Sequence, residues 1–326
     1  PGRLAVSVEE FHRRCAAAQR TAPTGMTALT THDTKRGEDV RARIGVLSEV
    51  PGAWTAAVTR WAAHNAGHWA ETPSDRDAEY LLYQTLVGTW PIGTDRLLGY
   101  VEKAAREAKQ RTSWLDPDER YESGLASFVR AVVADEAFIA DLEAFLAPLS
   151  DAVQVTALAQ KLVQLTAPGV PDVYQGTEVW EDNLVDPDNR RPVDYPLRRG
   201  LLAELDDLSA TDVWARRAEG LPKLLVTSRA LRLRRARPDL FDRDAGYAPL
   251  AARGELADHV VAFTRAQTVA TVVPRLVVGL DDWRGTTLVL PPGDWRDDLT
   301  GAQVDGGDVS VGELLSDFPV ALLARR

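Results

Sequence analysis

Two short runs of β-compatible residues flank a long helical stretch in this chain of 326 residues. Residues 25–31 form the first run, which leads directly into His32 and Asp33, and residues 167–178 form the second, which leads into a polar loop. A strand that follows a helix and ends on polar residues is the repeating pattern of a parallel sheet or barrel. We therefore expect two buried strands of an α/β fold, each with a candidate site at its carboxyl end.

The stretch from about residue 41 to residue 163 shows helical periodicity almost throughout. Trp54, Val58 and Trp61 recur at helical spacing and predict an apolar face, so both tryptophans are expected in a core and not against a sugar ring. The stretch is too long for the single helix that usually joins neighbouring parallel strands. We therefore predict a helical insertion over residues 49–150, between α/β segments at residues 1–48 and 151–240.

The chain changes character after Phe241. Short segments separated by Gly, Pro and Asp predict strands at residues 259–263, 270–273, 286–290 and 320–323. Closely spaced short strands are typical of antiparallel sheets, so we predict a small antiparallel β domain over residues 241–326. The helix expected before it, at residues 221–238, carries several arginines, which we assign to a solvated helix face.

The chain is acidic, with a formal net charge of -10 and a pI near 5.1. Nucleic acids and anionic membrane surfaces are thereby excluded as main partners, because a polyanion would be repelled at long range. No apolar run is expected to be long enough to span a bilayer. Cys15 is the single cysteine, which precludes a disulfide within the chain and indicates a reducing, cytoplasmic setting. Because the chain starts at Pro1 without methionine or signal sequence, we expect it to begin inside a longer polypeptide.

The residues around the His-Asp pair form the motif TTHDTKRGEDVRARI at residues 30–44. This motif resembles the segment at the end of the seventh barrel strand in the maltooligosyltrehalose synthases of the α-amylase superfamily. Residues 167–178 and 185–195 are similar to the eighth strand of that barrel and its loop. The resemblance extends over nearly the whole chain through residues 221–241 and 295–301.

The resemblance implies an α/β fold made of the C-terminal part of a (β/α)8 barrel. The barrel's last two strands, a large helical insertion and a small antiparallel β domain would make up the chain. Thr31 departs from the wider superfamily, where many members place asparagine before the His-Asp pair. The departure favours a synthase over a plain hydrolase.

The family converts maltooligosaccharides to maltooligosyl trehalose by moving the terminal α-1,4 linkage to an α,α-1,1 linkage within one substrate molecule. By resemblance, Asp33 is the third active-site carboxylate, which binds ring hydroxyls of the reacting sugar, and His32 binds a hydroxyl beside it. A retaining mechanism also needs a nucleophile and an acid/base about 5 Å apart. The family carries these earlier, one of them in a Gly-x-Arg-x-Asp segment that this chain lacks. We therefore expect the chain to depend on the upstream half of the same enzyme and to be inactive alone.

The substrate-binding candidates lie in the two strand-end loops, where polar side chains fit a closed site that retains glucose and excludes water. They are Lys35, Arg36, Tyr174, Gln175, Glu178, Asp188, Arg190 and Arg191. For each of them a surface ion pair is the alternative, and for Asp33 the alternative is capping of the next helix. His64 and His68 have helical spacing but no His-Glu-x-x-His motif, so we predict neither a metal nor a cofactor.

Two other functions stay open. The chain would be a non-catalytic glucan-binding fragment if the complete polypeptide bound substrate without turnover. It would belong to another α-amylase relative, an oligoglucan hydrolase or transferase, if reducing sugar were released in place of a trehalosyl product.

Overall fold

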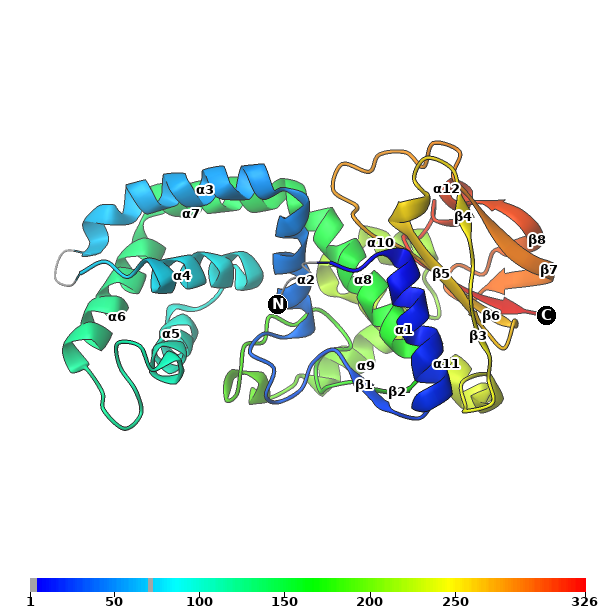
Figure 1. Cartoon of the computed structure of the whole chain (residues 1–326), viewed down its shortest axis with the longest axis horizontal. Coiled ribbons are helices and arrows are strands. Elements are labelled where there is room, and N and C mark those ends of the chain that lie inside the picture. The colour runs from blue at the N-terminus through cyan, green and yellow to red at the C-terminus, as the bar shows by residue number, and fades with distance from the viewer. Residues whose placement is uncertain (1–4, 70–72) are drawn as a thin grey trace. The chain divides into compact units, whose positions relative to one another are not determined.

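The computed structural model describes residues 5–69 and 73–326 (Figure 1). The chain divides into two compact units. The sheet unit consists of Pro1–Thr31, Gln154–Trp180 and Pro192–Arg326, and the helical unit consists of His32–Val153 and Glu181–Arg191. Each unit is therefore built from segments that lie far apart in the sequence.

The sheet unit begins with a helix and a short parallel strand pair. Helix α1 (Val8–Thr21) is capped by Ser7, whose hydroxyl accepts the Glu10 amide at 3.1 Å. Strand β1 (Met26–Ala28) pairs in parallel with β2 (Val170–Asp172), so the expected parallel pairing of these two runs is present.

The expectation that these two strands are buried is wrong. Met26 is 79% exposed and Val170 is 49% exposed. Strands of parallel sheets are ordinarily buried because neighbouring strands and helices cover them. Here the pair forms a two-stranded sheet, and in the part of the chain that the structure describes no further strand joins it.

Gly169 sets the close approach of this strand pair. Its φ is +126°, and a Cβ there would lie 2.7 Å from both the Gly25 carbonyl oxygen and Thr27 Cγ2. The next amide, of Val170, donates to that same carbonyl oxygen at 2.9 Å. Only glycine fits this backbone without displacing the neighbouring strand.

Further helices of the sheet unit lie between β2 and the antiparallel strands in the sequence or directly before β2. They are α8 (Ser150–Thr166), which belongs to the sheet unit from Gln154 on, α9 (Tyr195–Glu204), α10 (Ala210–Ala215) and α11 (Leu221–Ala236). Helix α11 confirms the helix expected at residues 221–238 to within two residues. Leu162 of α8 and Val226 of α11 are fully buried in one apolar core with Phe263 and Leu322 of the sheet.

The antiparallel strands predicted after Phe241 form a seven-stranded sheet with the order β3-β5-β6-β9-β7-β4, in which β8 also pairs with β7 (Figure 1). Every pairing in it is antiparallel. Alternate residues of β5 enter different cores, because Val261 and Phe263 pack toward the helices whereas Val260 and Ala262 pack on the opposite face. The remaining elements are β3 (Tyr247–Pro249), β4 (Ala252–Arg253), β5 (Val260–Arg265), β6 (Val269–Pro274), β7 (Thr287–Asp297), β8 (Gln303–Ser310), α12 (Val311–Leu314) and β9 (Ala321–Arg325).

The helical unit contains α2 (Glu38–Val46), α3 (Pro51–His64), α4 (Arg76–Thr89), α5 (Thr94–Ala108), α6 (Glu119–Ala134) and α7 (Glu136–Leu146). Trp61 of α3 is 1% exposed, and its ring centroid lies 5.4 Å from that of Tyr83 and 5.6 Å from that of Phe138. Trp54 is 8% exposed and packs edge-on against Trp61. Both tryptophans are core residues, as predicted. Short 3-10 turns occupy Leu47–Glu49, Asn65–Trp69, Ala147–Leu149, Asp188–Arg190, Arg217–Glu219, Pro238–Leu240 and Ala257–His259.

One helical stretch of the described residues contradicts the expectation that no run is long enough to cross a membrane. Glu136–Thr166 is 31 residues long and, by length and mean hydropathy, apolar enough to cross a membrane. Helices in the core of a protein can be as long and as apolar, and Leu158, Leu162 and Leu165 of this stretch are core residues.

Candidate functional site

The His32–Arg36 segment and the 181–191 loop meet in the helical unit. The Asn189 side-chain amide donates to the His32 carbonyl oxygen at 2.8 Å, across 157 positions of sequence. The Gly37 amide donates to the Asn183 carbonyl oxygen at 2.7 Å, and Arg36 forms an antiparallel bridge with Leu184. Two segments singled out from the sequence are therefore joined side by side.

Asp33 lies in a turn beyond β1, and its side chain is exposed, as is that of His32. The next helix, α2, begins at Glu38 with Gly37 as its N-cap and with no side-chain capping bond. Asp33 is therefore not the N-cap residue of α2. Both side chains are accessible to a ligand.

Lys35 and Arg36 already have partners on neighbouring helices. Lys35 Nζ donates to Glu107 Oε2 of α5 at 2.8 Å, and this hydrogen bond raises the pKa of Lys35. The lysine side chain nevertheless stays 63% exposed. Arg36 donates to Gln84 Oε1 at 3.2 Å and to Thr85 Oγ1 at 3.4 Å, both on α4.

A cavity of about 410 Å³ opens beside these side chains. It is lined by Thr34, Lys35, Arg36, Arg41, Ile44 and Gly45. Three of these six residues carry cationic donors, which suit hydroxyl or other oxygen acceptors.

Asp188, Arg190 and Arg191 lie in the 181–191 loop. Arg190 pairs with Asp186 at 2.9 Å. Arg191 Nη2 donates to Asp182 Oδ1 at 3.0 Å, and Arg191 Nε donates to the Asp188 carbonyl oxygen at 3.1 Å. The ion-pair alternative thus describes the contacts of Arg190 and Arg191.

Two residues that order this loop, one on α5 and one in the loop itself, were not predicted from the sequence. Arg96 of α5 binds the side chains of both Asp182 and Asp188. Asn189, which is 3% exposed, carries the hydrogen bond to His32. No local pattern marks Arg96, because its partners lie 86 and 92 positions further along the chain.

Tyr174, Gln175 and Glu178 belong to the sheet unit and follow β2 directly. Arg198 of α9, 9% exposed, organises this turn, donating to the Gly176 carbonyl oxygen at 2.7 Å and to Glu178 Oε2 at 3.4 Å. The carbonyl oxygen of Tyr174 accepts from the Thr177 hydroxyl at 2.7 Å. Gln175 is exposed.

Comparison with known proteins gives a consistent result. No family model matches the chain. The chain is 44% identical to a Mycobacterium tuberculosis protein named "Putative maltooligosyl trehalose synthase". The match covers the whole of this chain and 41% of that protein. The fold of this chain matches the structure of maltooligosyltrehalose synthase from Arthrobacter ramosus with a TM-score of 0.89 and 40% identity, over 99% of this chain and 41% of that one. The chain is similar to one portion of the maltooligosyltrehalose synthases.

This confirms the resemblance found in the sequence. A further maltooligosyl trehalose synthase structure, 27% identical, matches 98% of this chain and 42% of its own with a TM-score of 0.81. The chain spans about two fifths of the length of the relatives it matches, which is consistent with a C-terminal portion of a synthase.

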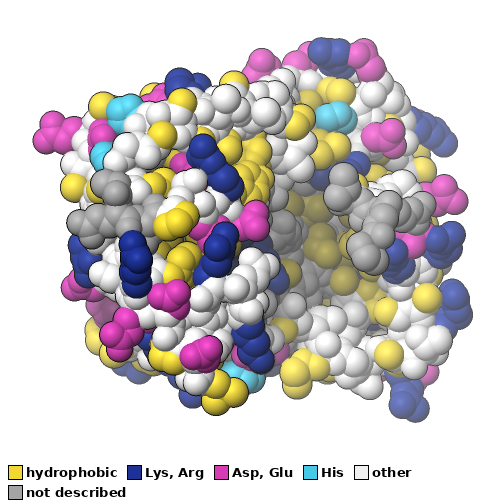
Figure 2. All heavy atoms as spheres, turned by 60° about the vertical axis from the view of Figure 1, so that its left-hand side comes forward, with side chains coloured by type: hydrophobic (Ala, Val, Ile, Leu, Met, Phe, Trp, Pro, Cys, Tyr) yellow, Lys and Arg dark blue, Asp and Glu magenta, His cyan; other side chains and the backbone are white. Residues whose placement is uncertain are grey.

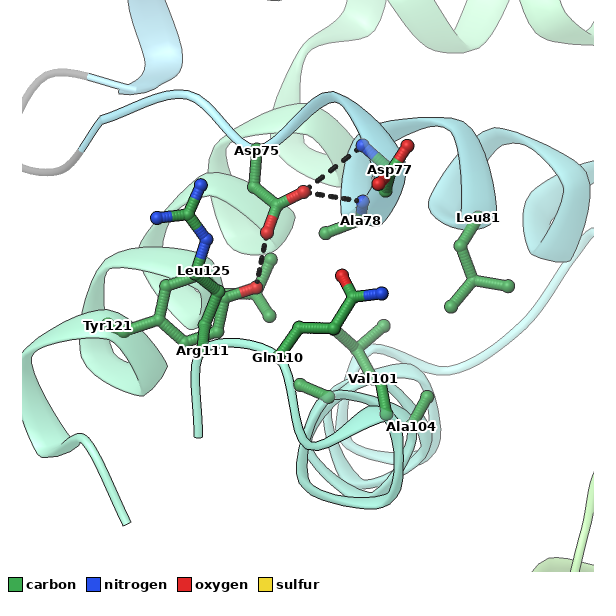
Figure 3. Close-up of a pocket in the computed structure, with 12 residues that line it drawn as sticks. Asp75, Asp77, Ala78, Leu81, Val101, Ala104, Gln110, Arg111, Tyr121 and Leu125 are labelled. Carbon is green, nitrogen blue, oxygen red and sulfur yellow. Dashed lines mark hydrogen bonds between the residues drawn. The ribbon is translucent and has the colours of Figure 1, made fainter. Parts of the chain in front are cut away.

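The helical unit has a second cavity, of about 160 Å³, between α4, α5 and α6 (Figure 3). Asp75 borders it, accepts from the Asp77 and Ala78 amides at 3.1 and 3.0 Å, and accepts from the Tyr121 hydroxyl at 2.8 Å. Val101 and other small apolar side chains form much of the remaining wall. The Asp75 carboxylate joins two helices, which gives it a structural role without a ligand.

The charged side chains on the face shown in Figure 2 and the histidines of the helical unit bear on two other kinds of site, a basic patch and a metal site. In the view of Figure 2, Lys and Arg side chains are interspersed with Asp and Glu and do not gather into a basic patch. His64 and His68 both lie against Asp135, with Nε2 to Oδ2 distances of 3.0 and 3.4 Å. Over residues 5–69 and 73–326, no group of three or more His, Cys, Asp or Glu side chains has the geometry to hold a metal ion.

Proposed function

We propose that this chain is the C-terminal part of an enzyme that converts maltooligosaccharides to maltooligosyl trehalose. The carrying observation is the 44% identity over the whole chain to a protein named as such a synthase. The contact between the His32–Arg36 segment and the 181–191 loop supports the proposal, because it joins two regions that the motifs assign to one site. In this assignment β1 and β2 are the seventh and eighth strands of a barrel. The domain limits proposed for the enzyme are residues 1–48, 49–150, 151–240 and 241–326, which divide the chain differently from its two compact units.

The chemistry proceeds by two displacements on one face of the sugar. A carboxylate of the upstream half attacks the anomeric carbon of the penultimate glucose, while a second carboxyl of that half protonates the departing oxygen of the terminal glucose. The freed glucose turns over and attacks the glycosyl-enzyme through its own anomeric hydroxyl, whose proton passes to the second carboxyl of the upstream half. This step restores the attacking carboxylate and gives the α,α-1,1 linkage. The α configuration is retained because inversion occurs twice.

Asp33 binds ring hydroxyls of the sugar at the reacting centre and stabilises its oxocarbenium-like transition state, with His32 on a neighbouring hydroxyl. The exposed position of both side chains supports this role. Lys35, Arg36, Tyr174, Gln175, Glu178, Arg190 and Arg191 bind the remaining hydroxyls. Asp188, expected from the sequence to bind a hydroxyl as well, has both carboxylate oxygens bound by Arg96 and orders the loop instead. The one unpaired cysteine, Cys15, fits a reducing cytoplasm as the place of action.

The test is to assay maltopentaose conversion by the 326-residue chain, by the upstream half, and by the two together. We expect 1,1-linked product from the mixture or from the full-length polypeptide, and none from this chain alone. Free glucose or other reducing sugar as the main product would indicate a hydrolase. Binding without turnover by the full-length polypeptide would indicate a glucan-binding protein, and product from this chain alone would overturn the assignment of the missing carboxyls.

A further inference from the structure

Arg96 in α5 is bound to two carboxylates of the 181–191 loop. Its Nε and Nη2 donate to the two side-chain oxygens of Asp188 at 2.7 and 2.9 Å, and its Nη1 donates to Asp182 Oδ2 at 2.8 Å. Nη2 also lies 3.3 Å from the Asp182 carbonyl oxygen. A planar guanidinium can serve two carboxylates in this way, whereas an ammonium cannot. One side chain from another helix therefore joins both sides of the loop.

Arg191 of the loop itself also pairs with both carboxylates. The side chain of Arg191 is 40% exposed, whereas that of Arg96 is 23% exposed and that of Asp188 is 14% exposed. Charge pairs strengthen as they leave water, and a lone buried carboxylate is strongly unfavourable. Arg96 is therefore the partner whose loss would most disturb the loop.

A short series of contacts leads from Arg96 to the His32–Asp33 turn. Asp188 Oδ2 accepts the Leu184 amide at 2.8 Å, which fixes the segment that bridges to Arg36. The residue after Asp188 is Asn189, and its side-chain amide donates to the His32 carbonyl oxygen at 2.8 Å. A shift of the loop would therefore displace the turn that carries Asp33.

We propose that Arg96 is a positioning residue of the substrate site, which holds the 181–191 loop through Asp182 and Asp188 and thereby places the His32–Asp33 turn. Arg96 touches neither the sugar nor the reacting atoms. The proposal rests on the proposed function for its link to catalysis, but the ordering of the loop stands on the contacts alone.

The pKa shifts of Asp188 and Arg96 both favour the charged forms of this ion pair. Burial alone would raise the pKa of Asp188, but hydrogen bonds from Arg96 and from the Leu184 amide outweigh it, and the pKa lies below its ordinary value. Burial alone would lower the pKa of Arg96, but hydrogen bonds to Asp188 and Asp182 outweigh it and raise that pKa. The pair stays charged at neutral pH.

Trypsin provides a readout of the loop that needs no substrate. It cleaves after arginine but not before proline, so the Arg190–Arg191 bond is open to it whereas the bond to Pro192 is not. Arg190 is 56% exposed, so access depends on how firmly the loop is held. In the full-length protein, Arg96→Ala should increase the rate of cleavage at this bond about tenfold or more, because local opening governs proteolysis.

Arg60→Ala is the matched control. Arg60 makes a comparable bidentate pair with Asp141 in the same unit, at 2.8 and 2.9 Å, and none of its hydrogen bonds reaches the loop. This control should leave cleavage at Arg190 unchanged. Arg96→Lys keeps the charge but not the planar pair of donors. Its rate of cleavage after Arg190 should lie between the rates of wild type and Arg96→Ala.

Kinetics on maltopentaose then connect the loop to the site. Arg96→Ala should lower kcat/KM by about 10- to 100-fold, with a fall in kcat and not only a rise in KM, since a misplaced Asp33 weakens the transition state. Arg60→Ala should leave both constants within about twofold of wild type. If Arg96→Ala does not fold, Arg96→Lys is compared with wild type in the same two assays, and we expect smaller changes in cleavage rate and kcat in the same directions.

Unchanged cleavage at Arg190 in both Arg96 variants would overturn the positioning role. Faster cleavage with unchanged kcat would overturn its link to Asp33. If the full-length wild type makes no trehalosyl product while Arg96→Ala still accelerates cleavage, the proposed function fails and the loop clamp stands.

Discussion

Asp297 in the sheet unit gives a stability prediction that depends on no functional assignment. It ends β7, is 1% exposed, and accepts the Leu299 and Leu322 amides on Oδ1 at 3.0 and 3.2 Å. Its Oδ2 accepts the Thr300 hydroxyl at 3.0 Å. Burial raises the pKa of Asp297 from 3.8 to about 6, because these hydrogen bonds only partly offset the desolvation of the charge.

The sign of the pH effect follows from proton binding. Between pH 3.8 and about 6 the folded state binds this proton more tightly than the unfolded chain does, so the free energy of unfolding falls as pH rises through that window. The shift of roughly two units corresponds to about 3 kcal/mol, which the ionised side chain costs above the window.

Asp297→Asn removes the titration and keeps the shape. Its Oδ1 still accepts both amides, and its NH2 can donate to the Thr300 hydroxyl. The difference in unfolding free energy, variant minus wild type, should therefore rise by about 2–3 kcal/mol between pH 4 and pH 7.5. Asp305→Asn, at an exposed position of β8, is the control and should show no such rise.

The assay is urea denaturation at a series of pH values, followed by tryptophan fluorescence, which reports on the buried Trp295 of the same strand among other tryptophans. A variant-minus-wild-type difference that stays constant with pH would refute the reasoning. It would mean that the hydrogen bonds compensate the buried charge fully.

Two further predictions concern the site and the strand pair. In the full-length enzyme, Lys35→Ala should raise the ratio of free glucose to 1,1-linked product from maltopentaose by about tenfold, because a charged hydrogen bond to the freed glucose is lost. Glu107→Ala, which removes the acceptor that Lys35 contacts at 2.8 Å, should leave this ratio unchanged. If Lys35→Ala also leaves the ratio unchanged by chromatography, Lys35 serves the ion pair alone. Gly169→Ala should lower the unfolding free energy by roughly 1–3 kcal/mol, because its φ of +126° and the 2.7 Å approach to Gly25 both disfavour a Cβ. Gly52→Ala in α3, where a Cβ meets nothing within 4 Å, should be neutral or stabilising in the same denaturation experiment.

Periodicity predicted the elements whose partners lie nearby. The helix α11 and the strands β5 and β6 appear close to their expected limits, and Trp54 and Trp61 of α3 lie in a core as expected. Strand β8 was missed because its residues, among them Asp305, Gly306 and Gly307, are poor strand formers, and pairing with β7 overrides their propensity.

The site was only partly predictable for a related reason. Motifs located the His32–Asp33 turn and the loop at residues 185–195, because each is a continuous run of residues. Arg96 is an isolated arginine on an amphipathic helix, and nothing in its neighbourhood distinguishes it from Arg106 on the same helix, which pairs with Glu122. Its partners become evident only once the chain has folded.

The central claim concerns Asp33, and replacement by asparagine in the full-length enzyme tests it most directly. Asp33 is exposed and α2 does not use it as a cap, so Asp33→Asn should leave the melting temperature within about 2 °C of wild type. Loss of a charged transition-state contact should lower formation of 1,1-linked product from maltopentaose by about a thousandfold or more. A variant that retains more than about a tenth of wild-type turnover, or one that loses its fold together with its activity, would contradict the account.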